Sequence, residues 1–140
     1  MSKHKQTRKS GIRTGNAGEY FVMGELLKQG FDAHLADRNT QGYDILVGRV
    51  EETSLRKVQV KTSRSTSSWY VKLASFEGKS LNLVTVYVLL GRDSTKPVRY
   101  FITRNRDLAE YVNRPSKWKK NAVISMKAVE QYENRWNVLR

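Results

Sequence analysis

The sequence predicts a single α/β domain in which a mixed β-sheet is flanked by helices. A segment near the N-terminus has the apolar spacing of a helix, and several short segments alternate as strands do. The chain has 140 residues, 39% of them hydrophobic, which suits one core and not two ordinary domains. We therefore expect a flexible basic arm over residues 1–15 and one globular domain over residues 16–140.

Composition limits both the partner and the chemistry. Lys and Arg number 26 against 13 Asp and Glu, and the net charge of +13 favours polyanions such as nucleic acids. No membrane-spanning stretch or signal peptide is evident, so we expect a cytoplasmic protein, nucleoid-associated if prokaryotic. Cysteine is absent and only two histidines occur, which excludes thiolate zinc sites. Any catalysis should use carboxylates and lysine.

The first predicted element is a helix over residues 16–30. Ala17, Tyr20 and Leu27 recur at helical spacing, with Met23 or Gly24 between them and Gly30 as the stop. The basic arm before it serves either to solubilise the chain or to grip phosphates.

Short strands should follow this helix. Residues 31–37 and 43–50 indicate two strands around a polar turn, and residues 51–63 a third strand, together forming an antiparallel meander. The remaining predicted elements are a possible edge strand over 69–73, a hairpin of 81–90 and 98–103, a short helix over 105–113 and a final helix over 125–139.

Polar residues interrupt these apolar strands at three positions. Asp44 stands in an apolar segment, where a charge costs several kcal/mol unless it is paired or binds metal. Gln59 and Lys61 leave the same strand face, roughly 6 to 7 Å apart. If the second and third strands are antiparallel neighbours, Asp44 lies beside Gln59 and Lys61. The structural alternatives are a strand-end turn for Asp44 and a solvated strand face for Gln59 and Lys61.

Oxygen donors next to a lysine suit phosphodiester hydrolysis. Such oxygens hold Mg²⁺, which lowers the pKa of an attacking water, and an ammonium can orient that water. The chain here resembles the PD-(D/E)xK nuclease superfamily in its QxK variant, through GNAGEYFVMGELLKQGF, GYDILV and VQVKTS in the first 63 residues. The resemblance implies the restriction-endonuclease-like fold. It also implies roles for Asp44 as principal metal ligand, Gln59 and the Val60 backbone carbonyl as further ligands, Glu19 as a ligand directly or through water, and Lys61 acting on the water.

Three positions need a further comment. Glu19 also stands three residues after Asn16, so the pair could instead form a capping box at the helix start. Tyr43 stands where the family name implies proline, and Gln59 removes one negative charge from the metal site. A catalytically inactive DNA-binding module with the same fold is therefore an alternative.

The resemblance implies a DNA endonuclease that uses Mg²⁺ or Mn²⁺ and in-line attack by water. Cutting both strands needs two sites, so a homodimer or higher symmetric homo-oligomer is expected. Holliday-junction resolvases, Mrr-like restriction enzymes and small homing endonucleases share the fold, so DNA specificity stays open. A basic RNA-binding accessory protein is a further alternative, supported by charge alone.

Aromatic residues near positive charge are candidates for DNA contact or for the core. They are Trp69, Tyr70 and Trp118, whereas Trp136 on the final helix should be a packing residue. The phosphate contacts are expected from Lys3, Lys5, Arg8, Lys9, Arg64, Lys117, Lys119 and Lys120.

Overall fold

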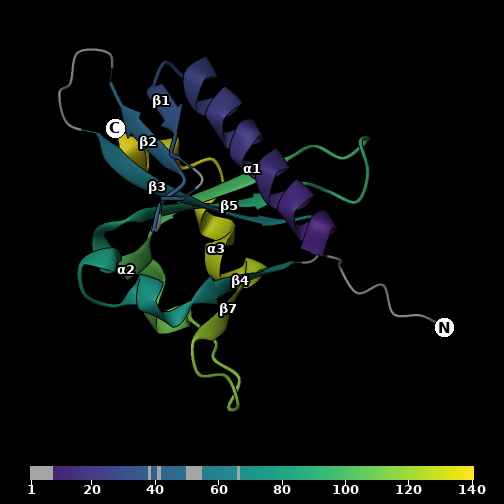
Figure 1. Cartoon of the computed structure of the whole chain (residues 1–140), viewed down its shortest axis with the longest axis vertical. Coiled ribbons are helices and arrows are strands. Elements are labelled where there is room, and N and C mark those ends of the chain that lie inside the picture. Colours follow the sequence, from purple (N-terminus) through teal and green to yellow (C-terminus); the bar gives the residue numbers. More distant parts are fainter. Residues whose placement is uncertain (1–7, 38, 41, 50–54, 66) are drawn as a thin grey trace.

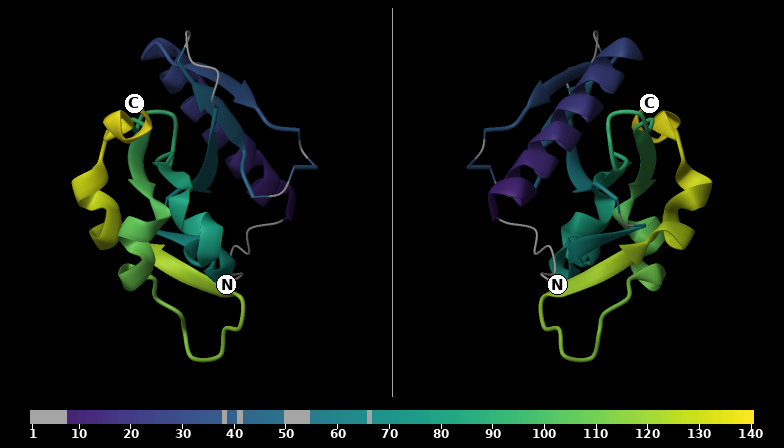
Figure 2. Two further views of the ribbon diagram at one scale, coloured as in Figure 1. Left: turned by 90° about the vertical axis from the view of Figure 1, so that its left-hand side faces the viewer. Right: turned by 90° about the vertical axis from the view of Figure 1, so that its right-hand side faces the viewer.

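The computed structural model describes residues 8–37, 39–40, 42–49, 55–65 and 67–140 (Figure 1). Within these residues a five-stranded sheet, the central sheet, has the order β1-β2-β3-β5-β6, and a two-stranded sheet, the small sheet, pairs β4 with β7. Helix α1 lies over one face of the central sheet, and the small sheet lies with α2 and α3 on the other (Figures 1 and 2). The predicted α/β class with a mixed sheet is confirmed.

Helix α1 (Arg8–Lys28) begins eight residues before the predicted start at Asn16. Residues 8–15 are therefore helical and not part of a flexible arm; residues 1–7 lie outside the described residues. Residues 8–15 lack apolar periodicity, but Thr14 is buried and accepts a hydrogen bond from the Arg64 Nε at 3.4 Å. This tertiary contact supports a turn of helix that local propensity does not favour.

The predicted meander is confirmed. Strands β1 (Asp32–Leu35), β2 (Ile45–Gly48) and β3 (Arg56–Ser63) pair antiparallel in sequence order. Strand β5 (Val84–Leu89) then runs parallel to β3, and β6 (Arg99–Arg104) closes the predicted hairpin by pairing antiparallel with β5.

Strand β5 is buried on both faces, as its continuous apolar sequence predicts. Val86 packs in the core beneath α1, while Tyr87 packs in the core beneath the small sheet. Trp69 joins the second cluster, and its indole N–H donates to the Val88 carbonyl oxygen at 2.9 Å. Trp69 is therefore a core residue.

The small sheet is only half predicted. Strand β4 (Ser68–Lys72) was expected as an edge strand, but its antiparallel partner β7 (Asn121–Ser125) was not. Short helical segments connect or follow the strands. They are η1 (Leu73–Phe76), η2 (Gly78–Asn82), α2 (Asn105–Leu108), η3 (Ala109–Tyr111), α3 (Met126–Val129), η4 (Glu130–Tyr132) and η5 (Trp136–Leu139).

The single final helix predicted over residues 125–139 is wrong. The segment breaks at Asn134, whose positive φ of 57° belongs to the left-handed region and ends a helix. Just before it, Glu133 forms a bridge to Phe101 and a bidentate ion pair with Arg99 at 2.9 Å. Trp136 is nevertheless a packing residue, 4% exposed, as predicted. In the described residues no helix has the length and apolarity needed to span a membrane.

Helix α1 lies very close to β3 at Gly18. A Cβ placed there would lie 1.8 Å from the Thr62 Oγ1 and 2.8 Å from its Cβ. The absence of a side chain at residue 18 therefore sets the distance between helix and sheet. Glu19, the next residue, depends on this spacing for its position.

Gly18→Ala should destabilise the protein by about 1–3 kcal/mol, because the new methyl group must push α1 away from β3. Gly24→Ala in the same helix is the matched control, since nothing lies within 4 Å of its added Cβ. It should be neutral or stabilising by up to about 1 kcal/mol. Denaturant unfolding of both variants checks this, and equal effects would contradict the close approach. Adding Thr62→Ala should partly restore Gly18→Ala.

Candidate active site

Asp44 lies at the corner where β2 begins beside β3. It stands immediately before β2, whereas the sequence had placed it within that strand. Its backbone N–H donates to the Val58 carbonyl oxygen at 2.9 Å. Its carboxylate Oδ2 accepts the backbone N–H of Val60 at 2.8 Å, in the place of a ladder hydrogen bond. The side chain is therefore held against the middle residue of Gln59-Val60-Lys61.

The Val60 backbone also directs an acceptor toward this corner. In an extended strand the N–H and C=O of one residue face the same neighbouring strand. Because the Val60 N–H faces Asp44, its carbonyl oxygen faces the same side, next to the point where β2 begins. The Val60 side chain stands out of the plane of the sheet, into the core beneath α1. Gln59 and Lys61 consequently leave β3 on the face opposite α1.

Gln59 and Lys61 both belong to this corner. Gln59 lines a hollow of about 540 Å³ together with Asp44 and Lys72. Burial lowers the pKa of the Lys61 ammonium, the nearby Asp44 carboxylate opposes that shift, and the Lys72 charge adds to it. The structure thus brings Asp44, Gln59 and Lys61 together, as the sequence predicted from strand pairing.

Glu19 reaches Asp44 from the other side. It lines a smaller hollow, about 130 Å³, with Asp37 and Asp44. Gln59 and Lys61 do not line that hollow, so Asp44 is the residue shared by the two groups. The capping box proposed for Asn16 and Glu19 is wrong, because both residues lie inside α1.

The oxygen donors at this corner fit a hard divalent cation. In the described part of the chain no three His, Cys, Asp or Glu side chains form a metal-binding group. Mg²⁺ does not require one, because it keeps several waters and takes one or two protein carboxylates plus substrate phosphate oxygens. The Asp44 carboxylate, the Gln59 amide oxygen and the Val60 carbonyl meet that requirement, with Glu19 in the adjoining hollow.

Two residues of the corner were missed in the sequence. Lys72 lines the hollow with Asp44 and Gln59 and also a second one with Lys61. Its signal was the alternation in β4, which places Lys72 on the exposed face with Tyr70. Asp37 carries no such signal, because a polar residue beside a turn is expected without any function.

The expected phosphate contacts are only partly placed. Lys3 and Lys5 lie outside the described residues, as do the side chains of Arg8 and Lys9. Lys119 and Lys120 line the hollow with Lys61, and Lys117 is exposed on the same loop. Arg64 is exposed at the end of β3, where it contacts Thr14.

This chain is similar to known proteins in its fold and not in its sequence. No family model matches the sequence, and no curated protein is significantly similar to it. Among solved structures, the chain is similar to a Holliday-junction resolvase from Archaeoglobus fulgidus, with 18% identity, a TM-score of 0.56, and 89% of this chain and 94% of the resolvase covered. It is also similar to a bacterial homing endonuclease, with 14% identity, a TM-score of 0.60 and 92% of each chain covered.

Both similar structures are nucleases with a restriction-endonuclease-like fold. The resemblance through Glu19, Asp44 and Gln59-Val60-Lys61 implied the same fold, with the glutamate on a first helix and the other residues at the second and third strands. This chain therefore has the restriction-endonuclease-like fold.

Proposed function

We propose that the protein is a DNA endonuclease that hydrolyses phosphodiester bonds with Mg²⁺ or Mn²⁺. The observation that carries the proposal is the Asp44 carboxylate hydrogen-bonded to the Val60 N–H, between Gln59 and Lys61. This bond holds an oxygen ligand beside an amide oxygen, a backbone carbonyl and an ammonium group. The similarity to a resolvase and a homing endonuclease supports a nucleic-acid substrate.

Each residue then has a defined task. Asp44, Gln59 and the Val60 carbonyl would hold the cation, with Glu19 contributing directly or through water. When bound, the cation supplies the acidity that makes a water nucleophilic and neutralises charge on the phosphate. Asp44 therefore serves as a ligand whose position is already fixed by the Val60 N–H before substrate arrives.

Lys61 would act on the attacking water. Burial lowers the pKa of its ammonium group, which eases proton transfer, while Asp44 keeps a negative charge nearby. Lysine in that position can orient the water for in-line attack and stabilise charge on the phosphate oxygens. Lys72, in the same hollow as Asp44, adds a second cation for the phosphate.

DNA is the polymer that the charge and the fold favour together. The net charge of +13 gives strong, salt-sensitive attraction to phosphates of any nucleic acid. A catalytically inactive DNA-binding module would share this attraction to phosphates, but a divalent cation would not make it cleave DNA. RNA binding by a basic accessory protein would show as preference for RNA in competition.

Cleavage of both strands would require a pair of active sites, which we propose are supplied by a symmetric homo-oligomer. Helix α1 exposes apolar side chains that suit contact with a second copy. Tyr20 and Leu27 lie seven residues apart on one stripe and are 57% and 52% exposed. Ile12 and Phe21 are also exposed on this helix.

Cleavage should depend on a divalent cation and on the residues of the corner. Supercoiled DNA should be cut with Mg²⁺ or Mn²⁺ and not with EDTA. Asp44→Asn and Lys61→Met should each lower the rate by about 10²–10⁴-fold, since each removes a group that acts on the reacting atoms. Lys79→Met, an exposed lysine outside the corner, is the charge-matched control and should cut normally. Equal, metal-independent backgrounds for all proteins would refute the enzyme.

Replacing Lys61 should lower activity but raise stability. The pKa of Lys61 is lowered from 10.5, so the folded state disfavours its charged form. Lys61→Met should therefore unfold at higher denaturant concentration than the wild type at neutral pH, although it is inactive. The unfolded chain binds more protons at this residue, so wild-type stability rises as pH increases toward 10.5 and the advantage of the variant shrinks. An advantage that grew with pH would contradict burial as the cause.

The exposed apolar stripe of α1 should control the oligomeric state. Leu27→Glu should shift the protein toward monomers, because a charge on the exposed stripe of α1 would be buried without a partner in the contact. Light scattering on a sizing column measures the mass of wild type and variant. Glu77→Gln, an exposed change remote from α1, serves as the control. A wild type that remained monomeric with DNA bound would rule out the oligomer.

A further inference from the structure

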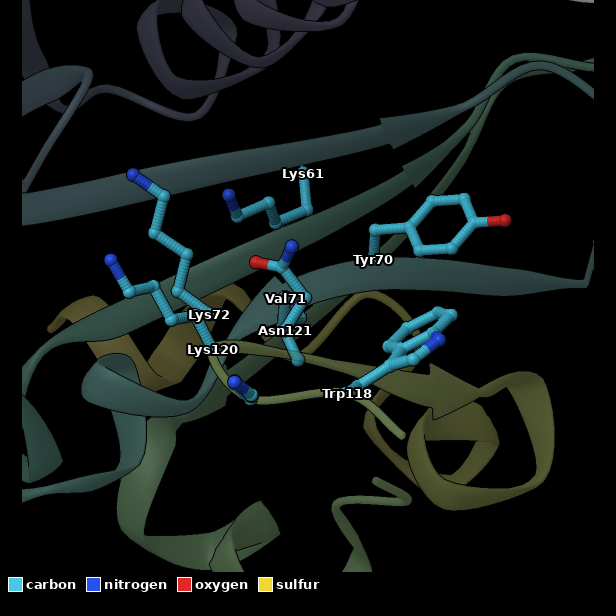
Figure 3. Close-up of a pocket in the computed structure, with 8 residues that line it drawn as sticks. Lys61, Tyr70, Val71, Lys72, Trp118, Lys120 and Asn121 are labelled. Atoms are coloured by element: carbon cyan, nitrogen blue, oxygen red, sulfur yellow. The ribbon is translucent and has the colours of Figure 1, made fainter. Parts of the chain in front are cut away.

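A cleft with an aromatic end and a basic end lies next to the active-site corner. It measures about 520 Å³ and lies between β3, β4 and the loop that leads into β7. Figure 3 shows the rings of Tyr70 and Trp118 side by side at one end and the Lys61, Lys72 and Lys120 side chains toward the other. We call this the aromatic–lysine cleft.

The aromatic pair is not part of the core. Residues of β4 alternate, so Trp69 is 2% exposed and packs inward, while Tyr70 is 75% exposed. The rings of Tyr70 and Trp118 have centroids 5.8 Å apart and planes inclined by 31°. Trp118 is half-buried, so Tyr70 is the more accessible ring of the pair. Aromatic side chains that reach the surface beside lysines are typical of surfaces on which bases stack.

We propose that this cleft binds an unpaired nucleotide of the DNA substrate, beside the phosphate that is cleaved. The proposal rests on the endonuclease function and specifies its substrate class: DNA with an unpaired segment at the cleavage site. The base stacks on the Tyr70–Trp118 pair, and its phosphates lie at the Lys72 and Lys120 ammonium groups.

The geometry places the base on the outside of the pair. A base inserted between two rings needs about 3.5 Å to each of them, or about 7 Å in total. The centroids of Tyr70 and Trp118 are only 5.8 Å apart, so no base fits between them. Tyr70 instead offers its own exposed face. A base within a duplex has both faces covered by neighbours, so only an unstacked base can use that face.

Lys61 links the cleft to catalysis. Its side chain lines the cleft, and its charge interacts with Asp44 at the metal corner. Lys72 makes the same connection, since it lines the hollow with Asp44 and Gln59 as well. A nucleotide held in the cleft therefore has its phosphate next to the reacting groups, and the unpaired position and the cut are adjacent in the substrate.

The test is binding of labelled DNA in metal-free buffer, where no cleavage occurs. One probe is a blunt duplex, another carries a single-stranded DNA extension, and a third carries the same extension as RNA. Tyr70→Ala and Trp118→Ala should each weaken binding to the DNA-extended probe about tenfold while changing duplex affinity less than about twofold. Tyr70→Phe, which keeps the ring, should bind like wild type. Tyr111→Ala removes an exposed tyrosine outside the cleft and is the matched control.

Equal losses on duplex and extended probes would overturn the proposal, as would loss in Tyr70→Phe equal to that in Tyr70→Ala. Tighter binding of the RNA extension would make RNA the occupant and also overturn it. Because Tyr70 is so exposed, its variants decide the outcome even if Trp118→Ala unfolds. Failure here with intact Mg²⁺-dependent cutting rejects the cleft alone. Binding of the DNA-extended probe that depends on the Tyr70 ring, without Mg²⁺-dependent cutting, would reject the endonuclease function and leave the cleft proposal standing.

Discussion

One hydrogen bond, from the Val60 N–H to the Asp44 carboxylate, organises the candidate active-site corner. Strand β2 begins one residue after Asp44, so the side chain takes over the ladder position that the strand leaves vacant. A backbone donor is obligatory and cannot be left unpaired when buried, and its acceptor here is the group that would hold a metal. The corner is therefore built by the same pairing that ends the strand, and its carboxylate costs little extra ordering when a ligand arrives.

The rest of the fold holds this corner from both faces. Beneath α1, Gly18 lets the helix lie directly on Thr62, which brings Glu19 to the hollow beside Asp44. On the other face, the pairing of β4 with β7 brings Lys72 and Lys120 alongside Lys61. Acidic groups thus gather at one side of β3 and basic groups at the other. Under the proposed function, this separation would let carboxylates face a cation while lysines face phosphate, without neutralising one another completely.

Local patterns predicted the elements that carry the corner. The helix bearing Glu19, the meander and the shared face of Gln59 and Lys61 follow from apolar spacing within short windows. What was missed depends on distant contacts. The start of α1 needs the burial of Thr14, and residues 125–139 read as one helix because Lys127 and its neighbours are good helix formers, although the segment breaks at Asn134. The cleft was hidden for the same reason, since it exists only once β4 and β7 pair.

The alternation along β3 keeps core packing and the candidate site on separate side chains. Val60 anchors the strand in the core, while Gln59 and Lys61 on either side of it face the small sheet. The loop that carries Trp118 and Lys120 lies outside both core clusters. Under the proposed function, substitutions in that loop would change which nucleic-acid shapes are accepted while the proposed hydrolytic groups stay in register. A chain built in this way would change its nucleic-acid target without rebuilding the groups proposed for its chemistry.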